Sequence, residues 1–449
     1  MVPFTSGPDA APESGVRSYS RDWPVQFTRA RGARLSDDQG RSYLDFFAGA
    51  GTLNYGHNHP VLKRALRDYL DEDGITHSLD LFTAARTGFL TALQRHVLAP
   101  RGLDYRVQFP GPTGTNSVEA ALKLARKVTG RSTVVAFTGA FHGMSLGSLA
   151  VTGNDAKRAG AGIPLAGVHR LPYDGFADGT VSGPALLDAM LRSGNSGLDR
   201  PAAVIVETVQ GEGGVNVASA RWLGELSDVC HRHGMLLIVD DVQMGCGRTG
   251  PFFSFEAAGV VPDIVCLSKA LSGYGLPLAL TLLRPELDVW EPGEHNGTFR
   301  GNNLAFVTAA AALTEFWRDS GLEKRTLRRG EVVHERLLAM ARTAPGTGAQ
   351  VRGRGLVWGL HFADASLAGR VARRAFTRGL LVETSGAYGE VLKLLPPLTA
   401  SDQELDEGLT ILAESITATL AQDGPPPDGI PSDATALTAI AATPFGENE

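Results

Sequence analysis

The chain has 449 residues, of which 43% are hydrophobic and 20% are charged, and its formal net charge is −6. This length exceeds what one small core can organise and allows two or three domains. The composition is that of a soluble globular protein, and the lack of a long basic run argues against nucleic acid or an anionic membrane as a partner. No stretch approaches the roughly 20 apolar residues of a membrane-spanning helix.

The chain ends and the cysteines carry further expectations. Residues 1–15 and 422–449 are poor in amphipathic pattern, so we expect a mobile N-terminus and a disordered tail. Cys230, Cys246 and Cys266 are odd in number and lie in or beside apolar runs, which favours core thiols in the reducing cytoplasm over disulfides. The N-terminus lacks a signal-peptide pattern, and no Cys/His spacing predicts a metal site.

The first elements of the chain mix a hairpin, a loop and helices. Segments 33–35 and 43–47 flank a turn and predict a hairpin. The small residues of 48–57 are typical of either an ordinary loop or a backbone that lines a cavity. From Pro60 the apolar spacing becomes helical, and 82–98 predicts a second amphipathic helix.

A Gly/Thr-rich turn at 111–117 precedes a clear helix at 118–128. Such a turn presents free N–H groups and hydroxyls at a helix N-terminus, which can bind an anion. Thr, Ser and Asn are also the usual capping residues, so the pattern fits an ordinary helix cap equally well.

Short apolar runs without apolar/polar alternation follow, separated by helix-like segments such as 220–231. This pattern predicts a mainly parallel sheet covered by helices on both faces. The runs are 134–137, 203–206, 236–239, 264–267 and 278–283.

Polar residues come directly after several of these runs. Phe141-His142, Glu207, Asp240 and Ser268-Lys269 each follow a predicted strand. In open α/β sheets ligands bind at the carboxyl ends of the strands, so these side chains should meet at one edge. A lysine after a buried strand is usually an ordinary solvated residue. At such an edge, however, desolvation disfavours its ammonium and makes Lys269 a candidate nucleophile that forms Schiff bases.

The polar residues after the predicted strands, together with the Gly/Thr-rich turn, fit the needs of pyridoxal phosphate. This cofactor requires an amine, a carboxylate for its ring nitrogen, a phosphate cradle, a ring-stacking side chain and a donor to its phenolic oxygen. One candidate is available for each requirement. Lys269 would be the amine and Asp240 the carboxylate. Gly114-Thr115 would form the phosphate cradle, Phe141 would stack on the ring, and Gln243 would donate to the phenolic oxygen.

Segments spread from about residue 45 to residue 397 resemble the class III, fold-type I pyridoxal-phosphate-dependent aminotransferases, the group of ornithine, 4-aminobutyrate and acetylornithine enzymes. Asp241 stands where Glu is more usual, and Asn116 where many relatives carry Glu. The resembling segments are 141–143, 207–214, 238–250, 267–269 and 296–299.

The resemblance implies pyridoxal 5'-phosphate as cofactor and an α/β fold with a large domain, 60–335, that has a mainly parallel seven-stranded sheet between helices. A smaller α+β domain would combine 16–59 with 336–421. Lys269 and Asp240 would be catalytic. Residues Gly114, Thr115, Phe141, His142, Glu207, Gln243 and Thr298 would also bind the cofactor, with Thr298 acting across the interface of a homodimer or higher homo-oligomer with shared sites.

Segments 17–21, 45–57, 107–116 and 298–303 resemble the family branch that makes 2,4-diaminobutyrate for ectoine synthesis. This likeness implies amino transfer from L-glutamate to L-aspartate 4-semialdehyde, with four substrate residues. They are Tyr19, Tyr55, Glu212 and Lys393.

Two of these residues allow more than one interpretation. Lys393 stands where ornithine aminotransferases carry an arginine for the substrate carboxylate, and an ammonium cannot form the bidentate pair that a guanidinium forms. Glu212 is either a gate that pairs with or releases a cation, or a carboxylate in a surface turn.

Three other functions compete with this one. Gly245, Gly247 and Gly250 have dinucleotide-fingerprint spacing, but Arg248 occupies the turn and 251–253 follow where a helix should begin, which excludes that fingerprint. A transaminase for ornithine, 4-aminobutyrate or another ω-amine stays open, and so does a catalytically silent cofactor-binding protein.

Overall fold

The computed structural model describes residues 13–422. The predicted disordered tail lies outside this range except for residue 422, as does most of the predicted mobile N-terminus. Within the described range no helix is long and apolar enough to cross a membrane.

A seven-stranded sheet organises the larger part of the molecule, in the order β4-β12-β11-β10-β7-β5-β6. Strand β12 pairs antiparallel with both neighbours and the other strands are parallel to one another, which confirms the mainly parallel sheet. The short β11–β12 connection has no crossover helix, so the chain must return antiparallel. The strands are β4 (Arg106–Gln108), β5 (Val134–Phe137), β6 (Val168–Leu171), β7 (Ala203–Val206), β10 (Leu236–Asp240), β11 (Ile264–Leu267) and β12 (Leu280–Leu283).

Helices cover both faces of this sheet because alternate strand residues point in opposite directions. Val134 and Ile238 pack with α5 (Gly114–Thr129), whereas Val135 and Leu237 pack with α9 (Ala220–Arg232) on the other face. The other helices of this part are α3 (Pro60–Asp71), α4 (Ala84–Leu93), α6 (Leu146–Val151), α7 (Asp155–Ala159), α8 (Gly183–Arg192) and α10 (Asn303–Phe316).

Sequence patterns located most of these elements. The predicted strands 134–137, 203–206 and 264–267 are confirmed with the same bounds, and the helix expected over 82–98 is α4 followed by a π-helical turn. The edge strands β4 and β6 were not predicted, because Arg and His interrupt their short apolar runs.

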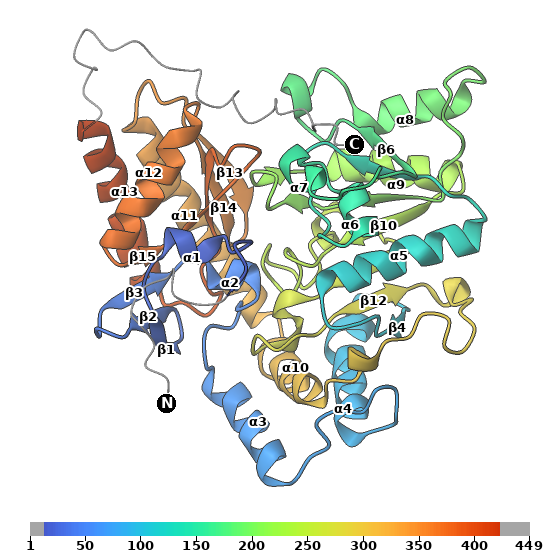
Figure 1. Ribbon diagram of the computed structural model, residues 1–449, viewed down its shortest axis with the longest axis horizontal. Helices are drawn as coiled ribbons and strands as arrows, with labels where there is room; N and C mark the ends of the chain where they lie inside the picture. The colour runs from blue at the N-terminus through green and yellow to red at the C-terminus, as the bar shows by residue number, and fades with distance from the viewer. Residues whose placement is uncertain (1–12, 423–449) are drawn as a thin grey trace, which may run out of the picture.

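A smaller α+β region combines both chain ends. Figure 1 shows the blue N-terminal strands beside the orange and red C-terminal helices. One sheet has the order β1-β2-β3-β15 and contains the predicted hairpin, and the other has the order β13-β14-β17-β16. Its strands are β1 (Phe27–Arg31), β2 (Arg34–Asp37), β3 (Ser42–Asp45), β13 (Gln350–Arg354), β14 (Val357–His361), β15 (Leu380–Leu381), β16 (Glu383–Ser385) and β17 (Val391–Leu394).

The expected boundary at residue 335 falls inside α11 (Gly321–Arg342). This helix packs against β13, β14 and α13, so it belongs to the smaller region from its start. A helix cannot change domain at mid-length without exposing part of its apolar face. The remaining helices of this region are α1 (Tyr19–Asp22), α2 (Ala48–Gly51), α12 (Ala365–Thr377) and α13 (Asp402–Gln422).

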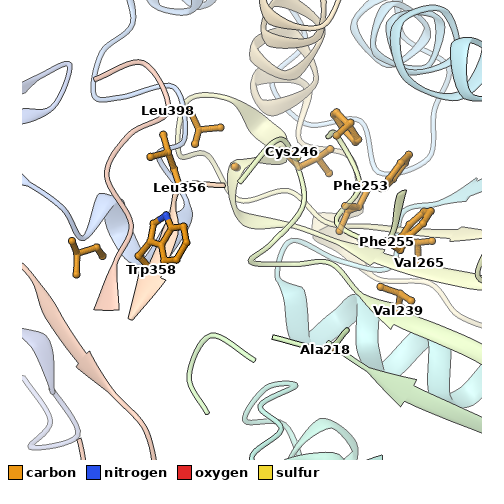
Figure 2. Packing of buried hydrophobic residues seen from close by; sticks show 14 of the residues in the cluster. Ala218, Val239, Cys246, Phe253, Phe255, Val265, Leu356, Trp358 and Leu398 are labelled. Atoms are coloured by element: carbon orange, nitrogen blue, oxygen red, sulfur yellow. The ribbon is translucent and has the colours of Figure 1, made fainter. Parts of the chain in front are cut away.

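One hydrophobic cluster joins the two regions. Figure 2 shows Val239 and Val265 of the large sheet continuing through Phe253 to Leu356 and Trp358 of the smaller region. Burying such side chains stabilises the fold by about 1.5–3 kcal/mol each. The edge of the large sheet and the smaller region are therefore held in a fixed relation, and the site lies between them.

Candidate active site

Lys269 lies at the carboxyl end of β11, next to the end of β10. Asp240 pairs in register with Cys266, so the two strands bring Asp240 and Lys269 to one edge of the sheet. Lys269 has φ +48°, a left-handed conformation that costs a non-glycine residue about 1–3 kcal/mol. Ser268 holds the preceding turn by donating its hydroxyl to the Leu278 carbonyl at 2.8 Å. The fold thus fixes Lys269 in an otherwise unfavourable backbone position.

An inner cavity of about 170 Å³ surrounds the Lys269 side chain. Burial lowers the pKa of Lys269, and the nearby Lys393 ammonium lowers it further, while Glu212 opposes the shift. A larger fraction of neutral amine is therefore present than for a solvated lysine. The cavity is lined by Gly114, Thr115, Phe141, His142, Gly143, Glu207, Glu212, Asp240, Val242, Gln243, Met244 and Lys269.

Asp240 is tied to His142 within this cavity. Its Oδ2 lies 2.7 Å from His142 Nδ1, and its Oδ1 accepts the Val242 N–H at 3.1 Å. Burial would lower the pKa of His142, but the adjacent carboxylate outweighs burial and raises it. The contact holds the Asp240 carboxylate in one orientation.

Glu207 supports the chain that carries Phe141. Its Oε1 accepts the Phe141 N–H at 2.9 Å, and its carbonyl accepts the Tyr173 hydroxyl at 2.8 Å. Burial raises the pKa of Glu207 to about 7. Glu207 therefore positions the aromatic segment at the cavity wall.

The N-terminus of α5 opens into the same cavity. Thr115 Oγ1 hydrogen-bonds with the hydroxyls of Ser145 at 2.6 Å and Ser148 at 2.9 Å. A Cβ on Gly114 would lie 2.8 Å from Val242 Cγ1, so the close approach of this turn to the strand end requires glycine. Backbone N–H groups here favour an anion, which supports the anion-site interpretation of the turn over a plain cap.

Gln243 connects the cavity with the small-residue loop. Its Nε2 donates to the Ala50 carbonyl at 3.0 Å and to Glu212 Oε1 at 3.2 Å. The loop at 48–57 thus supports a cavity residue. Phe141 forms another wall, and the ammonium of Lys157 lies 5.2 Å from the centre of its ring.

An outer cavity of about 1180 Å³ adjoins the inner one and shares Phe141 and Glu212 with it. Tyr19, Glu383 and Arg352 also line it. Glu212 therefore faces both spaces, and its interpretation as a surface-turn carboxylate is wrong.

Lys393 lies behind the outer cavity with no exposed surface. Its Nζ is 2.6 Å from Glu212 Oε1 and 3.2 Å from Glu383 Oε1. Burial opposes the charge of Lys393, but the two carboxylates raise its pKa above the ordinary value. Burial also opposes the charge of Glu212, yet Lys393 and Lys269 lower its pKa to about 2. We call Glu212, Glu383 and Lys393 the carboxylate–lysine cluster.

Two predicted site residues lie elsewhere. Tyr55 is a core residue and lines neither cavity: its ring stacks on Phe316, and its hydroxyl accepts the Trp317 indole N–H at 2.8 Å. Its segment turns back into the helix packing around α10, and its expected role in substrate binding stays a prediction. Thr298 is exposed and also lies outside both cavities. Its expected role from a second subunit stays a prediction.

Sequence reasoning missed Glu383 and Arg352. Both are on strands of the smaller region, β16 and β13, and reach the outer cavity through sheet pairing. Glu383 lies opposite Lys393 in the antiparallel register. A charged residue in a strand that pairs with a buried lysine would have been a usable signal, but the register is visible only in the folded sheet.

Known proteins match nearly the whole chain. The model of the family described as aminotransferase class-III matches residues 17–416. The chain belongs to the class III aminotransferases. Among curated relatives, a diaminobutyrate–2-oxoglutarate transaminase of Streptomyces anulatus is 64% identical over 407 residues, covering 91% of this chain and 96% of the relative. One of Nocardia farcinica is 63% identical over 404 residues, covering 90% and 92%.

Solved structures share the fold of this class III aminotransferase. An ornithine aminotransferase of Toxoplasma gondii, described with partial occupancy of PLP at its active site, has a TM-score of 0.77 and 29% identity. The match covers 89% of this chain and 90% of that one. A Bacillus anthracis aminotransferase has a TM-score of 0.81 and 24% identity, over 91% and 96% of the two chains, and shows the fold alone. The predicted family and fold class are confirmed.

Membership of the family implies pyridoxal phosphate as the cofactor, and the inner cavity fits it. The cavity places an amine of lowered pKa, an oriented carboxylate and a helix N-terminus around one small space. Val242 leaves no room for a Cβ on Gly114, so the cradle for an anion is held close to the strand ends. These features match the aldehyde, ring nitrogen and phosphate of the cofactor.

Proposed function

We propose that this aminotransferase moves the amino group of L-glutamate to L-aspartate 4-semialdehyde, giving 2-oxoglutarate and L-2,4-diaminobutyrate. The observation that carries the proposal is its 62–64% identity to several diaminobutyrate–2-oxoglutarate transaminases over at least 90% of the chain. The complete set of cofactor-fitting residues around Lys269 supports catalysis over a silent cofactor-binding protein. Use of the product in ectoine synthesis stays a prediction.

Lys269 is the residue that moves the proton. When bound, pyridoxal phosphate supplies a carbonyl for the amine and a ring that accepts electrons from the reacting carbon. Lys269 Nζ would hold the cofactor in the resting enzyme and then take and return the proton at the reacting carbon of the substrate. A buried lysine of lowered pKa is suited to this role because its neutral amine is the base.

Asp240 and His142 form a buried pair at the end of β10. The 2.7 Å contact fixes the carboxylate, and His142 balances it without exposing it to water. Asp240 would hold the cofactor's ring nitrogen in its protonated form, while Phe141 stacks on the ring. Thr115 and the α5 N-terminus would bind the phosphate.

Lys393 and Glu212 are placed to handle the distal carboxylate of glutamate. The ammonium of Lys393 is already occupied by Glu212 at 2.6 Å and by Glu383 at 3.2 Å. If Glu212 turns away, Lys393 becomes available to a substrate carboxylate. This supports the predicted gate role of Glu212, and Arg352, which lines the same cavity, offers a second cation.

We propose further that two copies assemble with shared sites. Phe82 and Phe299 are 96% and 70% exposed, although large aromatic side chains are usually buried, and Thr298 adjoins Phe299. Sedimentation or light scattering should give a dimer or a larger even assembly, and Phe299→Asp should shift it toward monomer. A wild-type monomer with full activity would contradict this. The three buried free thiols support the expected cytoplasmic location.

The reaction is tested with purified protein and pyridoxal phosphate. Diaminobutyrate with 2-oxoglutarate should yield glutamate, and glutamate with aspartate 4-semialdehyde should yield diaminobutyrate, identified by mass spectrometry. Ornithine and 4-aminobutyrate serve as competing amines. Faster turnover of either competitor would replace the proposed substrate with another ω-amine, and no turnover of any amine would favour a silent protein.

A further inference from the structure

Glu383 is a buried carboxylate whose oxygens are not satisfied. Its side chain is 3% exposed, and within residues 13–422 neither oxygen makes a hydrogen bond of good geometry. Its Oε1 lies 3.2 Å from Lys393 Nζ, but Glu212 binds the same ammonium at 2.6 Å. Two carboxylates therefore share one lysine, and the weaker contact belongs to Glu383.

When Glu383 is ionised, the charges of the carboxylate–lysine cluster do not balance. One ammonium faces two carboxylates, and burying a carboxylate without a partner costs several kcal/mol in real proteins. Burial raises the pKa of Glu383 to about 7, although Lys393 and Lys269 act in the opposite direction. A cation that enters the cavity would supply the missing charge.

Glu383 faces the outer cavity, where substrate must lie. That cavity shares Glu212 and Phe141 with the inner cavity around Lys269. Glu383 and Lys269 also influence one another's pKa, so they belong to one electrostatic site. A short molecule can thus present its reacting end to Lys269 and its far end to the cluster.

We propose that Glu383 is a specificity-determining residue that receives the second ammonium group of a diamino acid substrate. The inference rests on the proposed function, in which diaminobutyrate and aspartate 4-semialdehyde each keep an ammonium at the end that does not react. Glutamate has no second ammonium, and its distal group is a carboxylate. Glu383 therefore attracts one substrate class and repels the other unless a proton neutralises it.

The experiment removes the charge from each partner in turn. Glu383→Gln keeps the side-chain shape, and 4-aminobutyrate resembles diaminobutyrate without the second ammonium. The measured quantity is the ratio of kcat/KM for diaminobutyrate to kcat/KM for 4-aminobutyrate in the holoenzyme. A charge-assisted hydrogen bond predicts that Glu383→Gln lowers this ratio by roughly 10- to 100-fold. The kcat/KM for glutamate should stay unchanged or rise.

Glu390→Gln is the matched control. Glu390 lines the same cavity, but its Oε2 accepts the Tyr388 N–H at 2.8 Å and it is outside the cluster. This control should leave the ratio within about threefold of wild type. Glu383→Gln should fold, because Glu212 and Lys393 remain as a neutral pair.

A second readout is the pH dependence of the same ratio. Lys393 on β17, Glu212 in the turn that follows β8 (Val209–Gln210), Lys269 beyond β11 and Tyr19 on α1 all act on Glu383 or face it in the cavity. Protonation of Glu383 removes the attraction, so the ratio in wild type should fall as pH decreases through about 7. In Glu383→Gln this ratio of kcat/KM values should not change near pH 7.

The failures are distinguishable. A wild-type enzyme that does not use diaminobutyrate overturns the proposed function and this inference with it. A wild-type enzyme that prefers diaminobutyrate and keeps that preference in Glu383→Gln overturns only the role of Glu383. Equal losses with both amines would mean that Glu383 acts through the fold and not on the substrate ammonium, which also overturns the inference.

Discussion

Lys269 and Lys393 are both buried beside the same cavities, yet their pKa values move in opposite directions. Lys269 follows β11 and has burial as its dominant influence, so its pKa falls. Lys393 lies in β17 between Glu212 and Glu383, and these carboxylates outweigh burial and raise its pKa. Burial by itself therefore does not make a lysine reactive. The number of carboxylates in contact decides whether it acts as a base or remains a structural or binding cation.

Replacing Lys269 should give the largest effect of any single change. Lys269→Ala removes the amine that holds the cofactor and moves the proton, so transamination should fall by at least about a thousandfold. Steady-state rates and the absorbance of bound pyridoxal phosphate measure this. Lys63→Ala, a change of an exposed lysine on α3, should have no effect. Substantial turnover in Lys269→Ala would contradict the assignment.

Replacing Lys393 should instead cost stability. Lys393→Met leaves Glu212 and Glu383 buried together without their ammonium, which should lower the free energy of unfolding by about 3–5 kcal/mol. Urea denaturation of the holoenzyme measures the loss, with Lys63→Met as control. An unchanged free energy of unfolding would mean that Lys393 does not stabilise the two buried carboxylates, and the contrast with Lys269 would fail.

Tyr55 tests how far the site extends. Tyr55→Phe removes the acceptor of the Trp317 indole N–H, so stability should fall by about 1 kcal/mol. Activity and substrate preference should stay near wild type, because Tyr55 lines neither cavity. A change in KM for one substrate without a change in stability would return Tyr55 to the substrate site.

Glu212 links the two lysines, and its replacement should change the pKa of Lys269 only modestly, since one of several charges that act on this amine changes. Glu212 favours the ammonium of Lys269, so Glu212→Gln should lower the pKa of Lys269 further. Neutral amine would then be present at lower pH. Acetylation of Lys269 in cofactor-free protein, followed by mass spectrometry across pH, measures this, and Lys63 in the same digest is the internal control. If Lys269 were acetylated only at higher pH in Glu212→Gln than in wild type, the expected fall in its pKa would be contradicted.

Much of the fold and the inner cavity could be predicted from the sequence. Buried parallel strands are apolar along their whole length, so β5, β7 and β11 were located directly. Residues that follow such strands meet at one edge by topology, which placed Asp240 with Lys269. The edge strand β6 has no continuous apolar run, and one helix crosses the expected boundary near residue 335.

The sequence by itself determined the sheet and the residues at its carboxyl edge, because local periodicity and chain order encode them, and the resemblance of its motifs indicated the family. Only the tertiary structure decided the outer half of the site. Glu383 opposes Lys393 through antiparallel register, Glu212 reaches the same ammonium from a distant loop, and Tyr55 turns into the core. These contacts depend on packing between segments far apart in the chain, and the pKa of each lysine follows from that packing.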